Sequence, residues 1–167
     1  MGGAEYMKSI KKYETIINEA LRSALEYDTP EGQINEFISF FGKHIGSDRI
    51  YIFEDDEEHH VTNNTYEWCT EGITPQIEHL QGVNMEVIDW WYDTFEEGKS
   101  VIISDVEELK GVHQVSYNML KYQNVHKVVV SPLRHKGQIR GFFGVDNPPA
   151  VDYNALTMFL DMIGTML

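Results

Sequence analysis

Cysteine is almost absent from this chain. Cys69 is the single cysteine among 167 residues, so no disulfide can form within the chain. This excludes a small secreted fold held together by disulfides and leads us to expect a reducing compartment. The length suits one domain that buries a core without covalent cross-links.

Basic residues are also few. The chain has 13 Lys and Arg residues against 27 Asp and Glu residues, and its formal net charge is -14. Such a charge repels phosphate backbones and anionic lipid headgroups, so neither nucleic acid nor a membrane surface is expected as a partner. No apolar run approaches the roughly 20 residues that cross a bilayer, and the first residues lack the apolar segment of a signal peptide. We therefore expect a cytoplasmic protein.

The motifs of common catalytic and metal sites are missing too. The sequence contains no G-x-G-x-x-G, P-loop, H-E-x-x-H, G-x-S-x-G or C-x-x-C pattern. The acidic run at residues 55–58 lacks the ligand alternation and the glycine of a calcium loop, and the seven histidines show no ligand spacing. No metal site is predicted, and the cofactor stays unknown. Cys69 leaves a reactive thiol open as an alternative to a packed one.

Apolar residues predict a long helix at the start of the chain. Between residues 5 and 27 they recur at alternating steps of four and three, which is a heptad pattern. The members of this stripe are Tyr6, Ile10, Tyr13, Ile17, Ala20, Ala24 and Tyr27. The stripe can pack on the rest of its own domain or on a partner chain, and both readings stay open. A second helix is expected from Pro30 to about His44, capped by Thr29.

A long hairpin stands out in the second half of the sequence. Its strands are predicted at residues 127–133 and 139–145, with Gly137 in the turn. Alternation should place one set of residues on one face of the sheet and the other set on the opposite face. The first set is Ile139, Gly141, Phe143 and Val145, and the second is Arg140, Phe142, Gly144 and Asp146. Glycine weakens a strand unless something lies close to its backbone, so we expect a helix or a ligand against Gly141 and Gly144.

Further strands and helices complete the predicted fold. Strands are expected at residues 49–54, 61–69 and 101–103, and helices at 85–97, 112–123 and from 153 to the end. Within 61–69, alternation groups Asn64 with Tyr66 and Trp68. Val115, Met119 and Tyr122 should form the buried face of the helix at 112–123. This order predicts the α+β class, with a largely antiparallel sheet, terminal helices on one face and long connections on the other.

Large rings and a few polar side chains gather in the long connections and the strands that face them. Rings supply contact area and polar groups fix orientation, so this mixture is typical of a small-molecule pocket. The same rings can also do no more than pack the core. The candidate ligand-binding residues are Tyr66, Trp68, Trp90, Trp91, Asp105, Tyr117, Asn118 and Phe142.

Two stretches of the sequence carry a family resemblance. N-T-Y-E-W-C-T-E-G-I-T-P-Q-I-E-H-L-Q runs from Asn64 to Gln81, and S-P-L at 131–133 is followed by G-F-F-G-V-D-N-P at 141–148. Together they resemble the GAF domains that precede output domains, often diguanylate cyclases, in bacterial signalling proteins. The resemblance implies a six-stranded antiparallel sheet, a ligand pocket under the connections, and homodimerisation through terminal helices.

This resemblance leads to a functional hypothesis. Residues 1–28 would be a dimerisation or signalling helix, and residues 29–167 a non-enzymatic sensor domain that binds a small molecule and signals to an output domain in the same full-length chain. The chain lacks the pattern of GAF domains that bind cyclic nucleotides. It also lacks the several cysteines of GAF-fold methionine sulfoxide reductases, and Cys69 is the only residue available for bilin attachment. The alternative is a GAF-fold redox enzyme or thiol sensor that uses Cys69.

Overall fold

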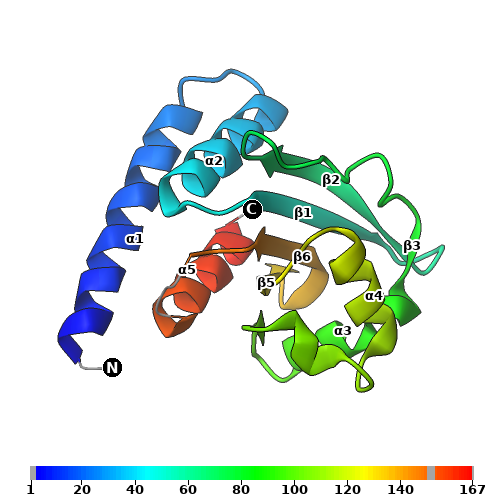
Figure 1. The fold of residues 1–167 in the computed structure, drawn as a ribbon. Helices are drawn as coiled ribbons and strands as arrows, with labels where there is room; N and C mark the ends of the chain where they lie inside the picture. Colours follow the sequence, from blue (N-terminus) through cyan, green and yellow to red (C-terminus); the bar gives the residue numbers. More distant parts are fainter. Residues whose placement is uncertain (1–2, 150–152, 167) are drawn as a thin grey trace.

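A single six-stranded sheet divides the molecule into two layers (Figure 1). The computed structural model describes residues 3–149 and 153–166, so the last position of the predicted C-terminal helix, Leu167, lies outside the described residues. The strand order is β3-β2-β1-β6-β5-β4, and every neighbouring pair is antiparallel. The predicted α+β class and six-stranded antiparallel sheet are therefore confirmed.

The elements follow the predicted order, with the addition of a short strand, β3, and of two 3-10 turns that the pattern did not predict. The helices are α1 (Gly3–Ala24), α2 (Pro30–Ile45), α3 (Asp89–Glu96), α4 (Gln114–Tyr122) and α5 (Tyr153–Met166), with two 3-10 turns, η1 (Met85–Ile88) and η2 (Val106–Leu109). The strands are β1 (Arg49–Asp56), β2 (Val61–Cys69), β3 (Val83–Asn84), β4 (Val101–Ile103), β5 (Val128–His135) and β6 (Gln138–Asp146).

Helices α1, α2 and α5 cover one face of the sheet, and η1, α3, η2 and α4 cover the other (Figure 1). We call the second group, with the 70–82 loop, the roof. Each layer has its own core. The helix-side core includes Phe41, Ile52 and Phe143, whereas the roof-side core includes Phe53 and Phe142. Consecutive residues of one strand therefore pack in opposite layers, because side chains alternate across a sheet.

The stripe on α1 packs within its own chain. Tyr13, Ile17, Ala20 and Ala24 are buried in the helix-side core together with residues of α2 and α5. The helix ends at Ala24, so the predicted last member of the stripe, Tyr27, lies beyond it and is exposed. The small side chains of Ala20 and Ala24 let neighbouring helices approach closely.

Both ends of α2 are set by local chemistry. Thr29 caps the helix, since its side-chain oxygen accepts a hydrogen bond from the Gly32 N–H at 3.0 Å, and Pro30 occupies the first turn. Gly46 ends the helix with φ at 77°, a conformation that glycine adopts without strain. The predicted start is confirmed, and the helix extends one residue past the predicted end at His44.

Two glycines within the return strand of the long hairpin are approached by the sheet itself, so the expectation of a helix or ligand at these positions is wrong. A side-chain carbon on Gly141 would lie 1.9 Å from the carbonyl oxygen of Phe53 on the neighbouring strand, and its φ is 152°. A side-chain carbon on Gly144 would lie 2.2 Å from the ring of Tyr51. The predicted division of Phe143 and Val145 from Phe142 and Asp146 is confirmed. The predicted place of Ile139 is wrong: Ile139 packs on the roof-side core, because Arg140 is an extra residue in β6 and reverses the alternation.

A bulge in β2 changes which residues share a face. Ile52 pairs with Tyr66 and Phe53 pairs with Asn64, so Thr65 is an extra residue in the strand. An extra residue reverses the alternation beyond it. Asn64 and Glu67 therefore point to the roof side, whereas Tyr66 and Trp68 pack on the helix-side core. The predicted grouping of Asn64 with Tyr66 and Trp68 is wrong for this reason.

The roof helices also differ from their prediction. The helix expected at residues 85–97 is broken into η1 and α3. On α4 the buried residues are Ser116 and Leu120, whereas Val115 and Tyr122 are exposed. Of the predicted face, Met119 is partly buried against the roof-side core and lines the cavity described below. The prediction is wrong for Val115 and Tyr122, because the helix meets this core along a neighbouring stripe that the spacing of its few apolar residues left undetermined.

Candidate functional site

A small cavity lies between the sheet and the roof. Its volume is about 30 Å³, which holds about two water molecules. Strands β1, β2 and β6 supply its floor, and the roof supplies its cover. The residues that line it are Arg49, Tyr51, Phe53, Asn64, Glu67, Leu80, Val83, Ile88, Trp91, Met119, Leu120, Gln123, Phe142 and Asp146.

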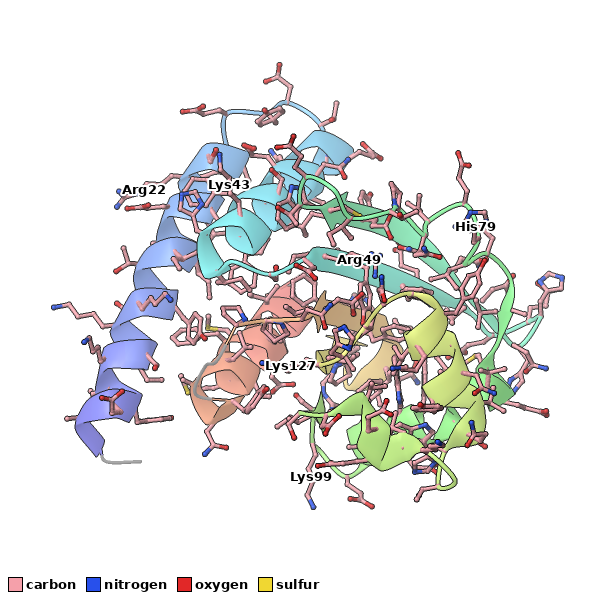
Figure 2. All side chains as sticks on the ribbon, viewed as in Figure 1. Arg22, Lys43, Arg49, His79, Lys99 and Lys127 are labelled. Carbon is pink, nitrogen blue, oxygen red and sulfur yellow. The ribbon has the colours of Figure 1, made fainter. Side chains whose placement is uncertain are left out.

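A buried ion cluster closes one end of this cavity. Arg49 at the start of β1 donates a hydrogen bond from one guanidinium nitrogen to Oδ2 of Asp146 at 2.5 Å. Its Nε lies 3.7 Å from a carboxylate oxygen of Glu67. The three side chains are at most 4% exposed. Figure 2 shows Arg49 on β1, close to α4, whose residues line the same cavity.

The same cluster holds the 70–82 loop in place. The Glu67 carboxylate accepts hydrogen bonds from the backbone N–H groups of Gln76, at 3.0 Å, and Ile77, at 3.3 Å. The second terminal nitrogen of Arg49 donates to the carbonyl oxygen of Thr74 at 2.8 Å. One wall of the cavity is thus tied to the sheet through charged groups, which form stronger hydrogen bonds than neutral ones.

Asn147, next to Asp146, fastens the other side of the cluster. Its side-chain oxygen accepts hydrogen bonds from the backbone N–H groups of His126, at 2.7 Å, and Lys127, at 3.0 Å. Its side-chain nitrogen donates to Asp48 at 2.9 Å. Asn147 has a φ of 50°, a left-handed conformation in which asparagine is enriched. These bonds join the end of β6 to the start of β5 and so fix the backbone that carries Asp146.

Burial dominates the electrostatics of the cluster. It raises the pKa of Asp146 from 3.8 to about 6, although the charge of Arg49 acts in the opposite direction. Burial, followed by the negative charge of Asp146, also raises the pKa of the Tyr51 phenol. Asp146 is thus ionised at pH 7 but becomes neutral in mildly acidic solution.

Three buried polar atoms of the lining have no hydrogen-bond partner among residues 3–149 and 153–166. They are Oδ1 of Asp146, Nε1 of Trp91 and Nε of Arg49. We call them the three unpaired atoms. A buried polar group without a partner costs about 1–3 kcal/mol, and native proteins satisfy nearly all such groups. Their common position on one cavity indicates a place for a polar molecule.

Aromatic rings form the rest of the cavity wall. Phe142 stands at the centre of the group, stacked on Phe53 with ring centroids 4.6 Å apart. The rings of Trp91 and Tyr51 meet Phe142 edge-on, at interplanar angles of 80° and 90°. The cavity therefore combines one charged end with a rigid apolar wall, as small-molecule sites do.

Known structures resemble this chain in fold, whereas by sequence the chain matches no family model and no curated protein. The phycocyanobilin-bound GAF domain of a cyanobacterial phytochrome aligns with a TM-score of 0.71 and 16% identity, over 92% of each chain. The GAF domain of a phosphoenolpyruvate-protein phosphotransferase from Coxiella burnetii also gives 0.71, with 11% identity over 94% of this chain and 90% of its own. This chain has the GAF fold.

The GAF fold also occurs in an enzyme among these neighbours. The free methionine-R-sulfoxide reductase from Neisseria meningitidis, solved in complex with its substrate, aligns with a TM-score of 0.67 and 10% identity. The alignment covers 94% of this chain and 86% of the reductase. At such identities the likeness concerns the fold alone, so the chemistry of this GAF-fold chain has to be argued from its own residues.

The predicted ligand-binding residues fall into three groups in the GAF fold. Trp91 and Phe142 line the cavity. Tyr66 and Trp68 lie on the opposite face of the sheet, where Trp68 packs closely against Gly42 of α2. A ligand in the cavity would therefore not reach these two rings.

The remaining predicted residues support the roof. The Trp90 indole N–H donates to the Ser116 hydroxyl at 3.0 Å and so joins α3 to α4. Asp105 caps η2, the Tyr117 hydroxyl donates to Glu107 at 3.1 Å, and Asn118 accepts from Gln114 at 2.8 Å. Each of these four side chains thus makes contacts within the roof.

Sequence reasoning missed the ion cluster of Arg49, Glu67 and Asp146. Its signal was present in part, because Arg49 and Asp146 flank long apolar strands, where a charge needs a partner if it is buried. Their partnership depends on the register between β1 and β6, in which Arg49 pairs with Asp146 across 97 positions of sequence. The sequence of either strand alone does not determine that register.

A reactive thiol and a metal site find little support in the described part of the chain. Burial, and next the negative charge of Glu67, raises the pKa of the Cys69 thiol, which lowers its thiolate fraction and makes it a poor nucleophile. The described residues contain no group of His, Cys, Asp or Glu side chains that could hold a metal ion. None of the helices in residues 3–149 and 153–166 is long and apolar enough to span a membrane.

Proposed function

We propose that this chain is a sensory GAF domain that binds a small polar molecule in the cavity between sheet and roof. The observation that carries the proposal is the set of three unpaired atoms, all buried and all on the lining of one cavity. The domain is non-enzymatic and cytoplasmic in this proposal. It passes the state of its cavity to an output domain in the same full-length chain.

Ligand binding would act on the roof. The cavity is small, so a ligand larger than a few atoms requires the roof to move outward. Two hydrogen bonds hold α3 to the sheet: the Tyr92 hydroxyl donates to Asp55 at 2.5 Å, and Arg134 donates to the carbonyl of Phe95 at 2.9 Å. A ligand that prefers one roof position would shift the population toward it.

The sheet offers a direct route from the cavity to the terminal helices. On β1, Tyr51 and Phe53 belong to the roof-side core, while the intervening Ile52 belongs to the helix-side core. Helix α5 presses closely on β5, where a side-chain carbon on Gly164 would lie 2.2 Å from the carbonyl oxygen of Pro132. Displacement of β5 is therefore expected to move α5, because the two backbones are in direct contact.

A blocked cavity provides the test of ligand binding. Val83→Phe places a ring in the cavity, so the variant is expected to lose a bound molecule that the native protein retains when it is purified from cells under mild conditions. Native mass spectrometry measures the retained mass. Val87→Phe is the matched control, since Val87 packs on the roof-side core but does not line the cavity. The proposal fails if no added mass accompanies the native protein, or if both variants keep it equally.

Homodimerisation is proposed to occur through the outer surfaces of α1 and α5. Met7, Met158 and Met162 are exposed there, and the Tyr6 hydroxyl, which lies 3.9 Å from the Met158 sulfur, places the two helices side by side. Exposed methionines suit an adaptable apolar interface. Four heptad residues of α1 are buried within the chain, and Tyr6 and Ile10 are partly buried against the same core, so a dimer would use these neighbouring positions instead.

Sedimentation equilibrium can test the dimer. We expect the native chain to be dimeric at about 100 μM, which is roughly 100 times a micromolar dissociation constant. The double variant Met158→Glu with Met162→Glu should be monomeric at the same concentration. Val115→Glu changes an exposed apolar residue of α4 and should leave the dimer intact. A monomeric native chain, or a dimer unaffected by the double substitution, would exclude this interface.

A further inference from the structure

We infer that the ligand of the cavity carries a protonated amine, or another cationic N–H group, a few bonds away from an oxygen acceptor. This inference rests on the proposed function and specifies the chemical class of the molecule. It follows from the three unpaired atoms and from the charges that surround them.

The charges at the closed end of the cavity are unequal. Two carboxylates, Asp146 and Glu67, face a single guanidinium, that of Arg49. The oxygens of Glu67 already accept hydrogen bonds from the backbone N–H groups of Gln76 and Ile77. The Tyr51 hydroxyl also interacts with the Asp146 carboxylate, but Oδ1 of Asp146 accepts no hydrogen bond from the described residues. A charged N–H donor forms a stronger hydrogen bond to this oxygen than a neutral hydroxyl does.

The two unpaired donors require an acceptor from the ligand, in contrast to Oδ1 of Asp146, which requires a donor. An indole N–H can only donate, and the same holds for the Nε–H of arginine. Nε1 of Trp91 and Nε of Arg49 therefore need an oxygen acceptor from the ligand. A hydroxyl or carbonyl oxygen satisfies such a donor without adding a third negative charge to the cluster.

The aromatic wall of the cavity also favours a cationic ligand. Faces of aromatic rings attract cations, and the cavity presents Tyr51, Phe53, Trp91 and Phe142. An anionic ligand would instead approach two buried carboxylates, which is unfavourable at short range. The volume of about 30 Å³ restricts the ligand to a few heavy atoms unless the roof opens. A small amino alcohol meets the conditions of charge and hydrogen bonding, and a slight outward movement of the roof gives room for its four heavy atoms.

Three isosteric probes separate the contributions of charge and oxygen. Ethanolamine has both groups, propylamine replaces the hydroxyl by a methyl, and ethylene glycol replaces the amine by a hydroxyl. Binding is followed in ¹⁵N-labelled native protein through the indole N–H resonance of Trp91, identified by its loss in Trp91→Phe. We expect ethanolamine to shift this resonance with a dissociation constant of about 1 mM, the range of fragment-sized ligands.

The expected order of affinity is ethanolamine first, with ethylene glycol at least about tenfold weaker, because a charge-assisted hydrogen bond is lost. Propylamine should be weaker as well and should shift the Trp91 signal less, since it offers no acceptor. Asp146→Asn should remove the preference for ethanolamine over ethylene glycol. Asp93→Asn, which removes an exposed carboxylate of α3, should preserve it.

The possible failures have different meanings. If ethylene glycol binds as tightly as ethanolamine with the same shifts, the cavity takes ligands but the cationic class is wrong. If none of the probes shifts the Trp91 signal at about 100 times the expected constant, the inferred ligand class is wrong, whereas the proposed function fails only if the native protein retains no molecule that Val83→Phe loses. The comparison of probes on native protein decides the matter even if Asp146→Asn does not fold.

Discussion

Arg49→Met is expected to lower the free energy of unfolding by about 3–5 kcal/mol at pH 7, the usual result when a buried ion pair loses one partner. The substitution keeps an apolar stem but leaves two buried carboxylates without their cation. It also removes the donor for the Thr74 carbonyl. Small domains are stable by about 5–15 kcal/mol, so the loss should be evident as a lower midpoint of urea unfolding.

Arg140→Met is the matched control for this prediction. Arg140 also lies on the sheet and faces an acid, with a nitrogen 3.6 Å from Glu57, but both side chains are exposed. Exposed pairs contribute about 0–1 kcal/mol, so this variant should stay close to the native protein. Adding Asp146→Asn to Arg49→Met should recover part of the lost stability, because one uncompensated charge is removed. Equal effects of the two arginine substitutions would show that the buried cluster does not stabilise the fold.

Asp146→Asn should change how stability depends on pH. The folded-state pKa of Asp146, about 6, lies above its ordinary value of 3.8, so the folded protein binds this proton more tightly than the unfolded chain. Its contribution to stability is complete below about pH 4 and is lost as the pH rises through 6. Asparagine does not titrate, so between pH 4 and 8 the stability of the variant should rise relative to the native protein by up to about 3 kcal/mol.

Urea unfolding at several pH values measures this difference. Subtracting the native curve removes the titration of the other acids, which the two proteins share. Asp93→Asn makes the same change in net charge at an exposed position and should give a flat difference. A flat difference for Asp146→Asn as well would mean that burial does not raise the pKa of Asp146.

Much of the fold could be predicted because its signals are local. The hairpin of β5 and β6 is marked by apolar runs around Gly137, and α2 is marked by Thr29 and Pro30. The wrong predictions concern positions where a single residue changes the pattern of a strand. Thr65 adds a residue to β2 and reverses its alternation, and the backbone of Phe53, not a ligand, explains Gly141.

The candidate site could be predicted only in part. Trp91 and Phe142 were identified by the expectation that rings in the long connections meet rings on the hairpin. Asp146 was placed on the same face as Phe142, but its pairing with Arg49 requires the order of strands in the sheet. Charges become part of a buried site through such long-range pairing, which a single sequence does not display.

The most direct measurement of the central claim is a high-resolution crystal structure of protein purified from cells without added ligand or dialysis. If the cavity binds a ligand as proposed, density for a molecule other than water is expected between sheet and roof. A nitrogen of that molecule should lie about 3 Å from Oδ1 of Asp146, and an oxygen about 3 Å from Nε1 of Trp91, the normal hydrogen-bond distances. A cavity of unchanged size that contains only water would contradict the account.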